Sequence, residues 1–404
     1  MRVFFCTGRM QNAAVFGQEL DTGMQQGDND TWWLKKQGAL LALADEHLNA
    51  YVYDLDTIRA AAGRMRSLDS VSRVLYAVKA NFNADVIRTL AEAGVDFDCV
   101  SPGEVRRLRD VLGKAAEGRI LFTPNFAPRD EYDWGLREGL RVTLDNLFPL
   151  KAWPELFSGK EIFIRIDPDR GGGHHRHVVT VGSGSKFGVS LSELDELVDL
   201  VADAGAVVTG IHAHSGSGIT EPANWQAVAN ALLEAARRFP TVRVLDLGGG
   251  IGVPDRHGEA GFDLAALDAF LAEFRAANPD YELWLEPGRY LVSEAGVLLA
   301  HVTQTKGKTS HRYVGLSTGM NSLIRPALYD AWHEIVNLTR FDEAATDTVT
   351  VVGPICETGD MLGTDRKLPP CKENDVMLIA NAGAYCLVMS SRYNLRDIPP
   401  EITL

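Results

Sequence analysis

The chain has 404 residues, of which 46% are hydrophobic and 23% charged, and its formal net charge is −14. This composition is typical of a globular protein large enough for a barrel and a second module. The acidic balance and the lack of a Lys/Arg cluster argue against nucleic acid as a partner. No apolar run is long enough to span a membrane.

The five cysteines form no Cys-x-x-Cys pair, which favours reduced thiols in the cytoplasm. The first residues lack an apolar core of signal-peptide length, so we expect no secretion signal. Residues 1–50 begin rich in Gln, Asp and Gly and become helical at about 32–47. We expect this N-terminal segment to pack onto a later β domain.

From Tyr51 onward, short β-type runs alternate with segments of helical periodicity. The predicted strands cover residues 75–79, 97–100, 120–123, 141–145, 162–167, 207–214, 243–247 and 282–286. Eight such units within residues 51–290 predict a (β/α)8 TIM barrel. An open doubly wound α/β sheet is the alternative, but no switch point in the strand order is evident.

The predicted secondary structure changes after the barrel. Residues 290–305, 349–352 and 376–380 are strand-like, and long helical segments are few. Residues 291–404 are therefore predicted to form an all-β domain of sandwich or barrel type.

Polar residues follow several of the predicted barrel strands. The first strand ends in Lys79, and the sixth, seventh and eighth are followed by residues 212–217, 246–252 and 286–289. Because active sites of such barrels lie at the C-terminal ends of the strands, these residues predict one site at the barrel mouth.

Lys79 taken alone is more simply a lysine whose amine reaches solvent from a strand end. Beside a functional site, burial is expected to lower its pKa and make it a Schiff-base nucleophile. Gly248, Gly249 and Gly250 allow backbone N–H groups to approach a phosphate, and Ser217 adds a hydroxyl. A dinucleotide fingerprint is disfavoured, because the loop follows the seventh strand and lacks the full Gly-x-Gly-x-x-Gly spacing.

A lysine, a phosphate cradle, a flat side chain and a carboxylate together indicate pyridoxal phosphate (PLP). Lys79 would carry the cofactor, His214 would stack on its ring, and Glu286 would pair with the ring nitrogen. Taken singly, His214 is more simply a core histidine, and Glu286 is a rim carboxylate paired with Arg289.

Residues 76–81, 214–217, 248–250 and 286–289 resemble the alanine-racemase-fold PLP decarboxylases. Residues 320–329, 356–360 and 383–385 are similar to the diaminopimelate decarboxylases within that group. The sequence most resembles the decarboxylase half of bifunctional aspartokinase/diaminopimelate decarboxylase chains, although we expect no kinase domain in a chain of this length.

The resemblance implies decarboxylation of meso-2,6-diaminopimelate to L-lysine and carbon dioxide, the last step of lysine biosynthesis. Lys79 and Cys356 are the implied catalytic residues, with Cys356 returning a proton. The implied cofactor contacts are Lys79, His214, Ser217, Gly248, Gly249, Gly250, Glu286, Gly288, Arg289 and Tyr385. The implied contacts with the amino-acid substrate are Arg289, Arg325, Tyr329, Glu357 and Tyr385.

In the family, the residues matching Cys356 and Glu357 come from the partner subunit, so a homodimer with shared active sites is implied. Ser317, Thr318, Ser322 and Gly218 depart from the usual pattern, which leaves the finer substrate contacts open.

Three alternatives remain open. A decarboxylase of ornithine, lysine or arginine with the same fold is disfavoured by the Arg325 and Tyr329 pair. An amino-acid racemase would use a tyrosine base and would lack Cys356 and Glu357. A catalytically silent regulatory homologue would not need Lys79 and Glu286.

The histidine-rich tract at residues 171–177 resembles a metal-binding segment. No nearby carboxylate or cysteine completes a ligand set, so we expect a loop after the fifth strand and no metal site.

Overall fold

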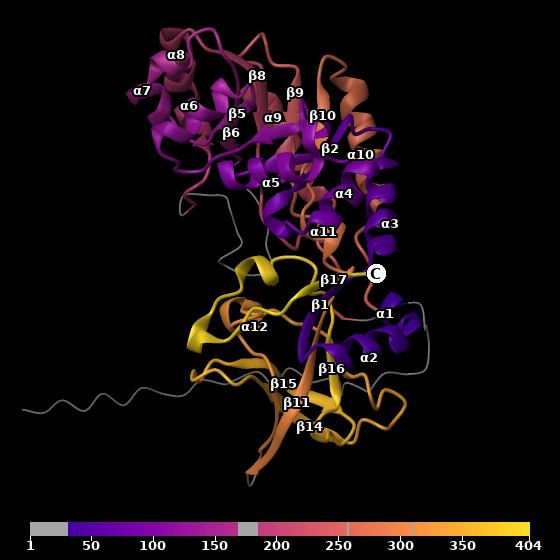
Figure 1. Cartoon of the computed structure of the whole chain (residues 1–404). Helices are drawn as coiled ribbons and strands as arrows, with labels where there is room; N and C mark the ends of the chain where they lie inside the picture. Colours follow the sequence, from indigo (N-terminus) through magenta and orange to yellow (C-terminus); the bar gives the residue numbers. More distant parts are fainter. Residues whose placement is uncertain (1–30, 169–184, 257, 309–310) are drawn as a thin grey trace, which may run out of the picture.

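The computed structural model describes residues 31–168, 185–256, 258–308 and 311–404. Figure 1 shows two parts, a barrel and a β domain at one end of it. The histidine-rich tract lies outside the described residues. Among the described residues, no helix combines the length and the apolar composition that a bilayer span requires.

Eight parallel strands form a closed ring, because β10 pairs with β2 at one seam and β5 pairs with β6 at another. The strands of the ring are β2 (Arg73–Ala77), β3 (Asp96–Cys99), β4 (Ile120–Phe122), β5 (Arg141–Leu144), β6 (Glu161–Asp167), β8 (Val207–His212), β9 (Val244–Asp246) and β10 (Glu282–Leu285). A short strand, β7 (Val189–Ser190), pairs with β6 outside the ring. The predicted (β/α)8 barrel is thus confirmed.

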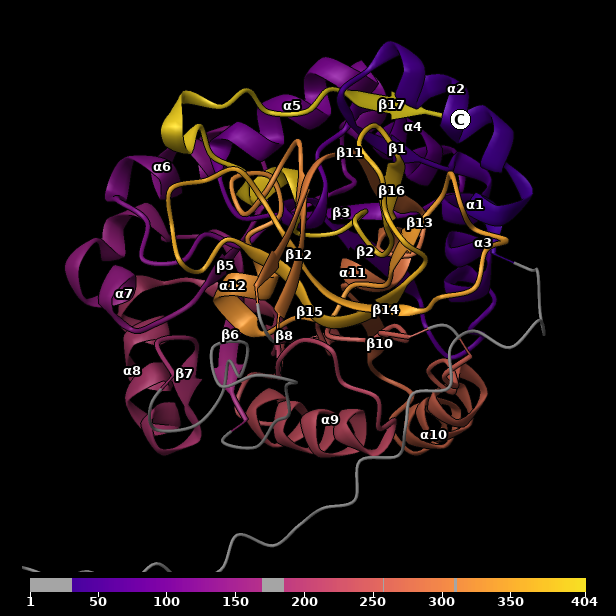
Figure 2. The ribbon, with the colours of Figure 1, turned by 90° about the horizontal axis from the view of Figure 1, so that it is seen from below.

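Helices surround the ring, as the view in Figure 2 shows. They are α3 (Leu55–Arg66), α4 (Ala84–Glu92), α5 (Pro102–Leu112), α6 (Arg129–Arg137), α7 (Phe148–Ala152), α8 (Leu194–Ala204), α9 (Ala223–Ala236) and α10 (Leu264–Ala277). Side chains cap several N-termini: Asn83 accepts from Val86 N–H, and Ser101 accepts from Glu104 N–H. These caps fix where α4 and α5 begin after β2 and β3.

The barrel interior is filled with side chains and is not a pore. Leu75, Leu121, Phe163, Val244 and Trp284 form one buried cluster inside the ring. The rings of Phe163 and Trp284 lie 5.5 Å apart. Position 210 must be glycine, because a Cβ there would lie 2.4 Å from the Phe163 ring. The packed centre leaves only the strand ends for chemistry.

The β domain is a mixed sheet with the strand order β13-β16-β11-β12-β14-β15, and β1 and β17 are attached beside β11. Its strands are β1 (Asn49–Tyr53), β11 (Gly296–Lys308), β12 (His311–Leu316), β13 (Ile335–Asn337), β14 (Asp347–Val352), β15 (Met361–Leu368), β16 (Val376–Ile379) and β17 (Glu401–Thr403). This confirms a second, all-β domain. The expected barrel boundary at residue 51 falls within β1.

Two N-terminal helices, α1 (Trp32–Lys35) and α2 (Gln37–Glu46), lie on this sheet. Trp33 and Leu40 share an apolar cluster with Val297 and Leu299 of β11. Figures 1 and 2 together show that the β domain covers one end of the barrel. Tyr385 N–H donates to Ala80 O at 2.9 Å, so this end carries the C-terminal end of β2.

Candidate active site

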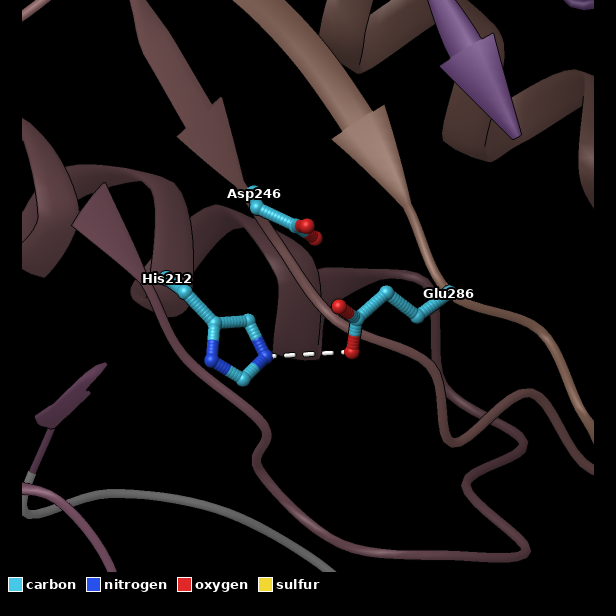
Figure 3. Close-up of side chains that lie close together, drawn as sticks. All are labelled: His212, Asp246 and Glu286. Atoms are coloured by element: carbon cyan, nitrogen blue, oxygen red, sulfur yellow. Dashed lines mark hydrogen bonds and ion pairs between the residues drawn. The ribbon is translucent and has the colours of Figure 1, made fainter. Parts of the chain in front are cut away.

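Side chains from different strand ends meet at the covered mouth of the barrel. Lys79 follows β2, and Asp98 lies on β3. His212 ends β8, Asp246 ends β9 and Glu286 directly follows β10. Figure 3 shows the last three pointing toward one another. All of these residues except Lys79 are buried.

Lys79 differs from its prediction in two ways. Strand β2 ends at Ala77, and Lys79 lies in a one-turn 3-10 helix, Val78–Ala80. Its Nζ lies 3.1 Å from Asp98 Oδ2. Burial alone would lower the pKa of the amine, but the charge of Asp98 outweighs it and raises the pKa above its usual value. The predicted lowering is therefore wrong for the free amine.

Glu286 is held as a buried anion. Its Oε2 lies 3.1 Å from His212 Nε2. Burial alone would raise the pKa of Glu286, but the charge and the hydrogen bond of His212, together with Lys79, lower that pKa to about 2. The other carboxylate oxygen, Oε1, is buried and has no hydrogen-bond partner among the described residues. A buried, ionised carboxylate suits a cationic N–H ligand.

Asp246 lies beside Glu286 but takes the opposite protonation state. Its Oδ1 accepts from Gly248 N–H at 3.0 Å. Burial and the charge of Glu286 raise the pKa of Asp246 well above its ordinary value. Two adjacent carboxyl groups cannot both ionise in such a site, so Asp246 keeps the proton and Glu286 the charge.

His212, Asp246 and Glu286 also form a conceivable metal set, because their ligand atoms all lie within 4.8 Å of one another. Histidine and carboxylates are ordinary zinc ligands. The surrounding glycines and Lys79 suit a phosphate-bearing aldehyde better.

His214 is a neutral imidazole at the edge of the glycine loop. Gly249 N–H donates to its Nδ1 at 3.2 Å. Burial and the charge of Arg165 lower the pKa of His214 well below its usual value. Because Nδ1 accepts, the neutral ring carries its hydrogen on Nε2.

The glycine loop after β9 has no room for side chains. A Cβ at Gly248 would lie 2.2 Å from Ala213 O, one at Gly249 would lie 2.1 Å from Glu286 O, and one at Gly250 would lie 2.5 Å from Gly216 O. Gly248 and Gly250 also have φ values of 68° and 102°. The loop thus brings bare backbone close to the mouth, as an anion cradle requires.

These features fit PLP. The loop offers a place for the phosphate, and the ionised Glu286 offers an anionic acceptor for the ring nitrogen. Ser217 Oγ accepts from Arg289 Nη2 at 3.1 Å, which places a cation beside the same loop. A Cβ at Gly288 would lie 3.0 Å from Tyr385 Oη. The Arg289 guanidinium also stands 5.1 Å from the Tyr385 ring.

A cavity of about 740 Å³ opens beside this cradle, and Arg289 and Arg325 both line it. Arg289 begins α11 (Arg289–Val292), and Arg325 begins α12 (Arg325–Tyr329). Burial and the charge of Arg325 lower the pKa of Arg289 to about 10. Tyr329 ends α12 and is half-buried. Two neighbouring guanidinium groups suit a carboxylate ligand.

Cys356 and Glu357 stand apart from this cluster. Both are exposed, in the loop between β14 and β15. Cys356 N–H donates to Asn394 Oδ1 at 2.7 Å, and Glu357 Oε2 accepts from Tyr393 Oη at 3.3 Å. Neither is among the described residues that line the cavity. The chain by itself brings Lys79, His214 and Glu286 together, but not these two.

Sequence reasoning assigned no role to Asp98, His212, Asp246 and His333. The first three do carry a signal, because His212 and Asp246 end barrel strands and Asp98 is next to the last residue of β3. His333 has no such signal, since its partner Arg325 is recognised only once α12 and β13 are placed.

Comparison with known proteins agrees with this site. Residues 55–293 match the family model of the pyridoxal-dependent decarboxylase, pyridoxal binding domain. The diaminopimelate decarboxylase of Methanothermobacter thermautotrophicus is 36% identical over 93% of this chain and 91% of its own. That of Deinococcus radiodurans is 34% identical over 87% and 89%.

Solved structures agree as well. The Helicobacter pylori diaminopimelate decarboxylase complexed with L-lysine superposes with a TM-score of 0.81 at 29% identity, covering 90% of this chain and 94% of the other. The chain therefore belongs to the pyridoxal-dependent decarboxylases and, within them, to the diaminopimelate decarboxylase family.

Proposed function

We propose that this protein decarboxylates meso-2,6-diaminopimelate to L-lysine and carbon dioxide, as the last step of lysine biosynthesis. The observation that carries the substrate assignment is the pair Arg289 and Arg325, which line one cavity beside the glycine loop. Diaminopimelate has a carboxylate at each end, so one end can react while the other binds these two cations.

PLP supplies the electron sink that accepts the electron pair left by the departing carboxylate. In our proposal Lys79 holds the cofactor covalently, and Glu286 accepts a hydrogen bond from its ring nitrogen. His214 lies against the ring. The phosphate group is held by Ser217, Gly248, Gly249 and Gly250. Gly288, Arg289 and Tyr385 are further contacts of the cofactor.

The residues around Lys79 control protons. Asp98 stabilises the protonated amine. His212 and Lys79 keep Glu286 ionised, while the neighbouring Asp246 keeps its proton. An ionised Glu286 favours a protonated ring nitrogen, which the chemistry needs. The β domain lies over the mouth of the barrel, so the reacting end of the substrate binds between the two domains in this proposal.

The distal end of the substrate supplies specificity in this proposal. Arg289, Arg325 and Tyr329 bind the distal carboxylate, with Tyr385 beside them. Glu357 binds the distal ammonium group, and Cys356 returns a proton to the carbon that lost carbon dioxide. A substrate without a distal carboxylate leaves buried Arg325 without an anion, which is costly.

We further propose a homodimer in which Cys356 and Glu357 complete the site of the partner subunit. Both residues are exposed, and exposed apolar side chains lie near them. Leu395 is 92% exposed with a φ of 55°, and it adjoins Asn394 and Tyr393, which bond to the Cys356–Glu357 loop. A strained, exposed leucine beside a catalytic pair is a feature of an interface that a second subunit covers.

A decarboxylase of lysine, ornithine or arginine is the second candidate, since the same cofactor site would serve it. The arginine pair disfavours it, because those substrates bring a cation to the distal end. A silent regulatory homologue is disfavoured by the presence of Lys79, Glu286 and Cys356 in one chain. A cytoplasmic location is also proposed, supported by the four free cysteines among the described residues.

The test is carbon dioxide release from meso-diaminopimelate, L-lysine, L-ornithine and L-arginine by the PLP-loaded protein. We expect release from diaminopimelate to exceed the others by at least about 100-fold in kcat/KM. Arg325→Gln should remove most of this preference, and Arg312→Gln, an exposed change on β12, should keep it. Faster release from L-ornithine or L-lysine than from diaminopimelate would overturn the substrate assignment.

A further inference from the structure

Arg325 has an unusual environment for a buried cation. Arg325 is only 4% exposed, and among the described residues its side chain bonds to a histidine and forms no ion pair with a carboxylate. Its Nη1 instead lies 2.9 Å from Nε2 of His333. Its Nε is buried without a hydrogen-bond partner in the described part of the chain, and the Cys386 thiol is the other polar group close to the guanidinium. A buried arginine held by a histidine leaves donors unused.

The protonation state of His333 follows from its second contact. Its Nδ1 lies 2.8 Å from Ala380 O, and a carbonyl oxygen can only accept, so Nδ1 carries the hydrogen. In a neutral imidazole, Nε2 is then an acceptor for the Arg325 N–H. Burial and the charge of Arg325 lower the pKa of His333 to about 3, which keeps the ring neutral.

The β sheet holds this contact in place. His333 lies just before β13, and Ala380 directly follows β16, its antiparallel partner. Ala380 N–H donates to Glu334 O at 2.9 Å and extends the ladder by one bond. The imidazole is completely buried. Because its backbone and its Nδ1 are both fixed, its Nε2 presents a fixed acceptor to α12.

The geometry of a guanidinium then decides which edge remains free. Nη1 is the nitrogen on the side of the Arg325 stem, and His333 occupies it. The opposite edge, formed by Nε and Nη2, is the one that binds a carboxylate with two parallel hydrogen bonds. Nε is the atom without a partner, and Arg325 lines the cavity.

We propose that His333 is a positioning residue for substrate specificity: it holds Nη1 of Arg325 so that the Nε–Nη2 edge binds the distal carboxylate of the substrate. This inference rests on the proposed role of Arg325 in substrate binding. His333 is not among the described residues that line the cavity, so it acts only through Arg325.

Two substitutions separate positioning from packing. In His333→Asn, the short amide reproduces the Nδ1–H donor to Ala380 O but does not reach Arg325. In His333→Gln, the longer amide places an oxygen where Nε2 lies and restores an acceptor for Arg325. If His333 has only a structural role, His333→Asn should be at least as active as His333→Gln. If His333 positions Arg325, His333→Gln should be the more active variant.

The measurements use PLP-loaded full-length protein, with meso-diaminopimelate and L-lysine as substrates. For His333→Asn we expect KM for diaminopimelate to rise about 10-fold or more, with kcat within about 3-fold of wild type. Kinetics with L-lysine, the melting temperature and the cofactor absorption band should stay close to wild type. His333→Gln should recover most of the KM.

The double variant Arg325→Gln/His333→Asn should be no worse than Arg325→Gln alone, because no guanidinium remains to be oriented. An unchanged KM for diaminopimelate in His333→Asn, or equal losses with both substrates, would overturn the inference. If wild type itself shows no preference for diaminopimelate, the proposed function fails first. If the preference depends on Arg325 but not on His333, only the present inference fails.

Discussion

The ammonium group of Lys79 and the carboxylate of Asp98 face each other at 3.1 Å across the ends of two neighbouring strands. This pairing has a cost for cofactor attachment, because only the neutral amine can bond to the cofactor aldehyde. Asp98 stabilises the charged form, so the neutral amine becomes abundant only at higher pH than usual.

Replacing Asp98 with Asn should therefore shift cofactor loading to lower pH. The rate at which the cofactor-free protein regains its visible absorption with added PLP should rise with pH in both proteins. The rise should begin at lower pH in Asp98→Asn, since the pKa of Lys79 falls when the anion is removed.

Asp96→Asn is the matched control for this experiment. Asp96 begins the same strand, but its carboxylate pairs with Arg73 and Arg119 away from the mouth. The rate of cofactor loading in Asp96→Asn should depend on pH as it does in wild type. If the pH profiles of Asp98→Asn and wild type coincide, Asp98 does not set the pKa of the Lys79 amine.

Among the elements, the loop after β9 has the least tolerance for change. A methyl group at Gly249 would overlap the backbone oxygen of Glu286, so Gly249→Ala must displace either the loop or the strand end that holds Glu286. Both displacements alter the place where the phosphate and the ring nitrogen are expected to bind.

We expect Gly249→Ala to weaken PLP binding by at least about 10-fold and to lower the free energy of unfolding by about 1–3 kcal/mol. Cofactor titration followed by absorption, together with thermal unfolding, measures both. Gly63→Ala is the control: Gly63 is an exposed residue of helix α3, and a Cβ there meets nothing within 4 Å. Unchanged cofactor affinity in Gly249→Ala would contradict the proposal that the glycine loop binds the phosphate of PLP.

The elements also show what could be predicted from the sequence. The barrel strands were predicted because each is a short apolar run between segments of helical period, as at 162–167 and 243–247. The 3-10 turn that carries Lys79 was missed, since Val78 and Ala80 continue the apolar pattern of β2. Residue 290 was read as strand, but it lies in the helical turn α11, and β11 begins only at Gly296.

The site was predictable only in part, for a related physical reason. Strand ends and glycine runs are local patterns, so Glu286 and Gly248–Gly250 stood out in the sequence. The pKa of Lys79 depends on Asp98, and the orientation of Arg325 depends on His333. Such charge and hydrogen-bond partners become known only when separate elements are placed side by side.

For the whole molecule, the exposed position of Cys356 predicts complementation between inactive variants. Lys79→Ala and Cys356→Ala should each be nearly inactive on diaminopimelate. If sites are shared, random exchange of subunits should restore about a quarter of wild-type activity, because half the dimers are mixed and each mixed dimer has one intact site.

Co-expression of the two variants ensures exchange, and mixing them after purification without exchange is the control. Mass measurement in solution shows whether mixed dimers have formed. Mixed dimers that are no more active than either variant alone would contradict the shared site.

The position of β1 has a consequence for how the chain is synthesised. Strand β1 precedes the barrel, yet its partners β11 and β17 follow it, so the barrel is topologically an insertion within the β domain. On the ribosome, β1 leaves the exit tunnel first and finds its neighbours only after the entire barrel has been made. The barrel can therefore fold before the β domain does, and the emergence of β17 completes the sheet next to the catalytic mouth.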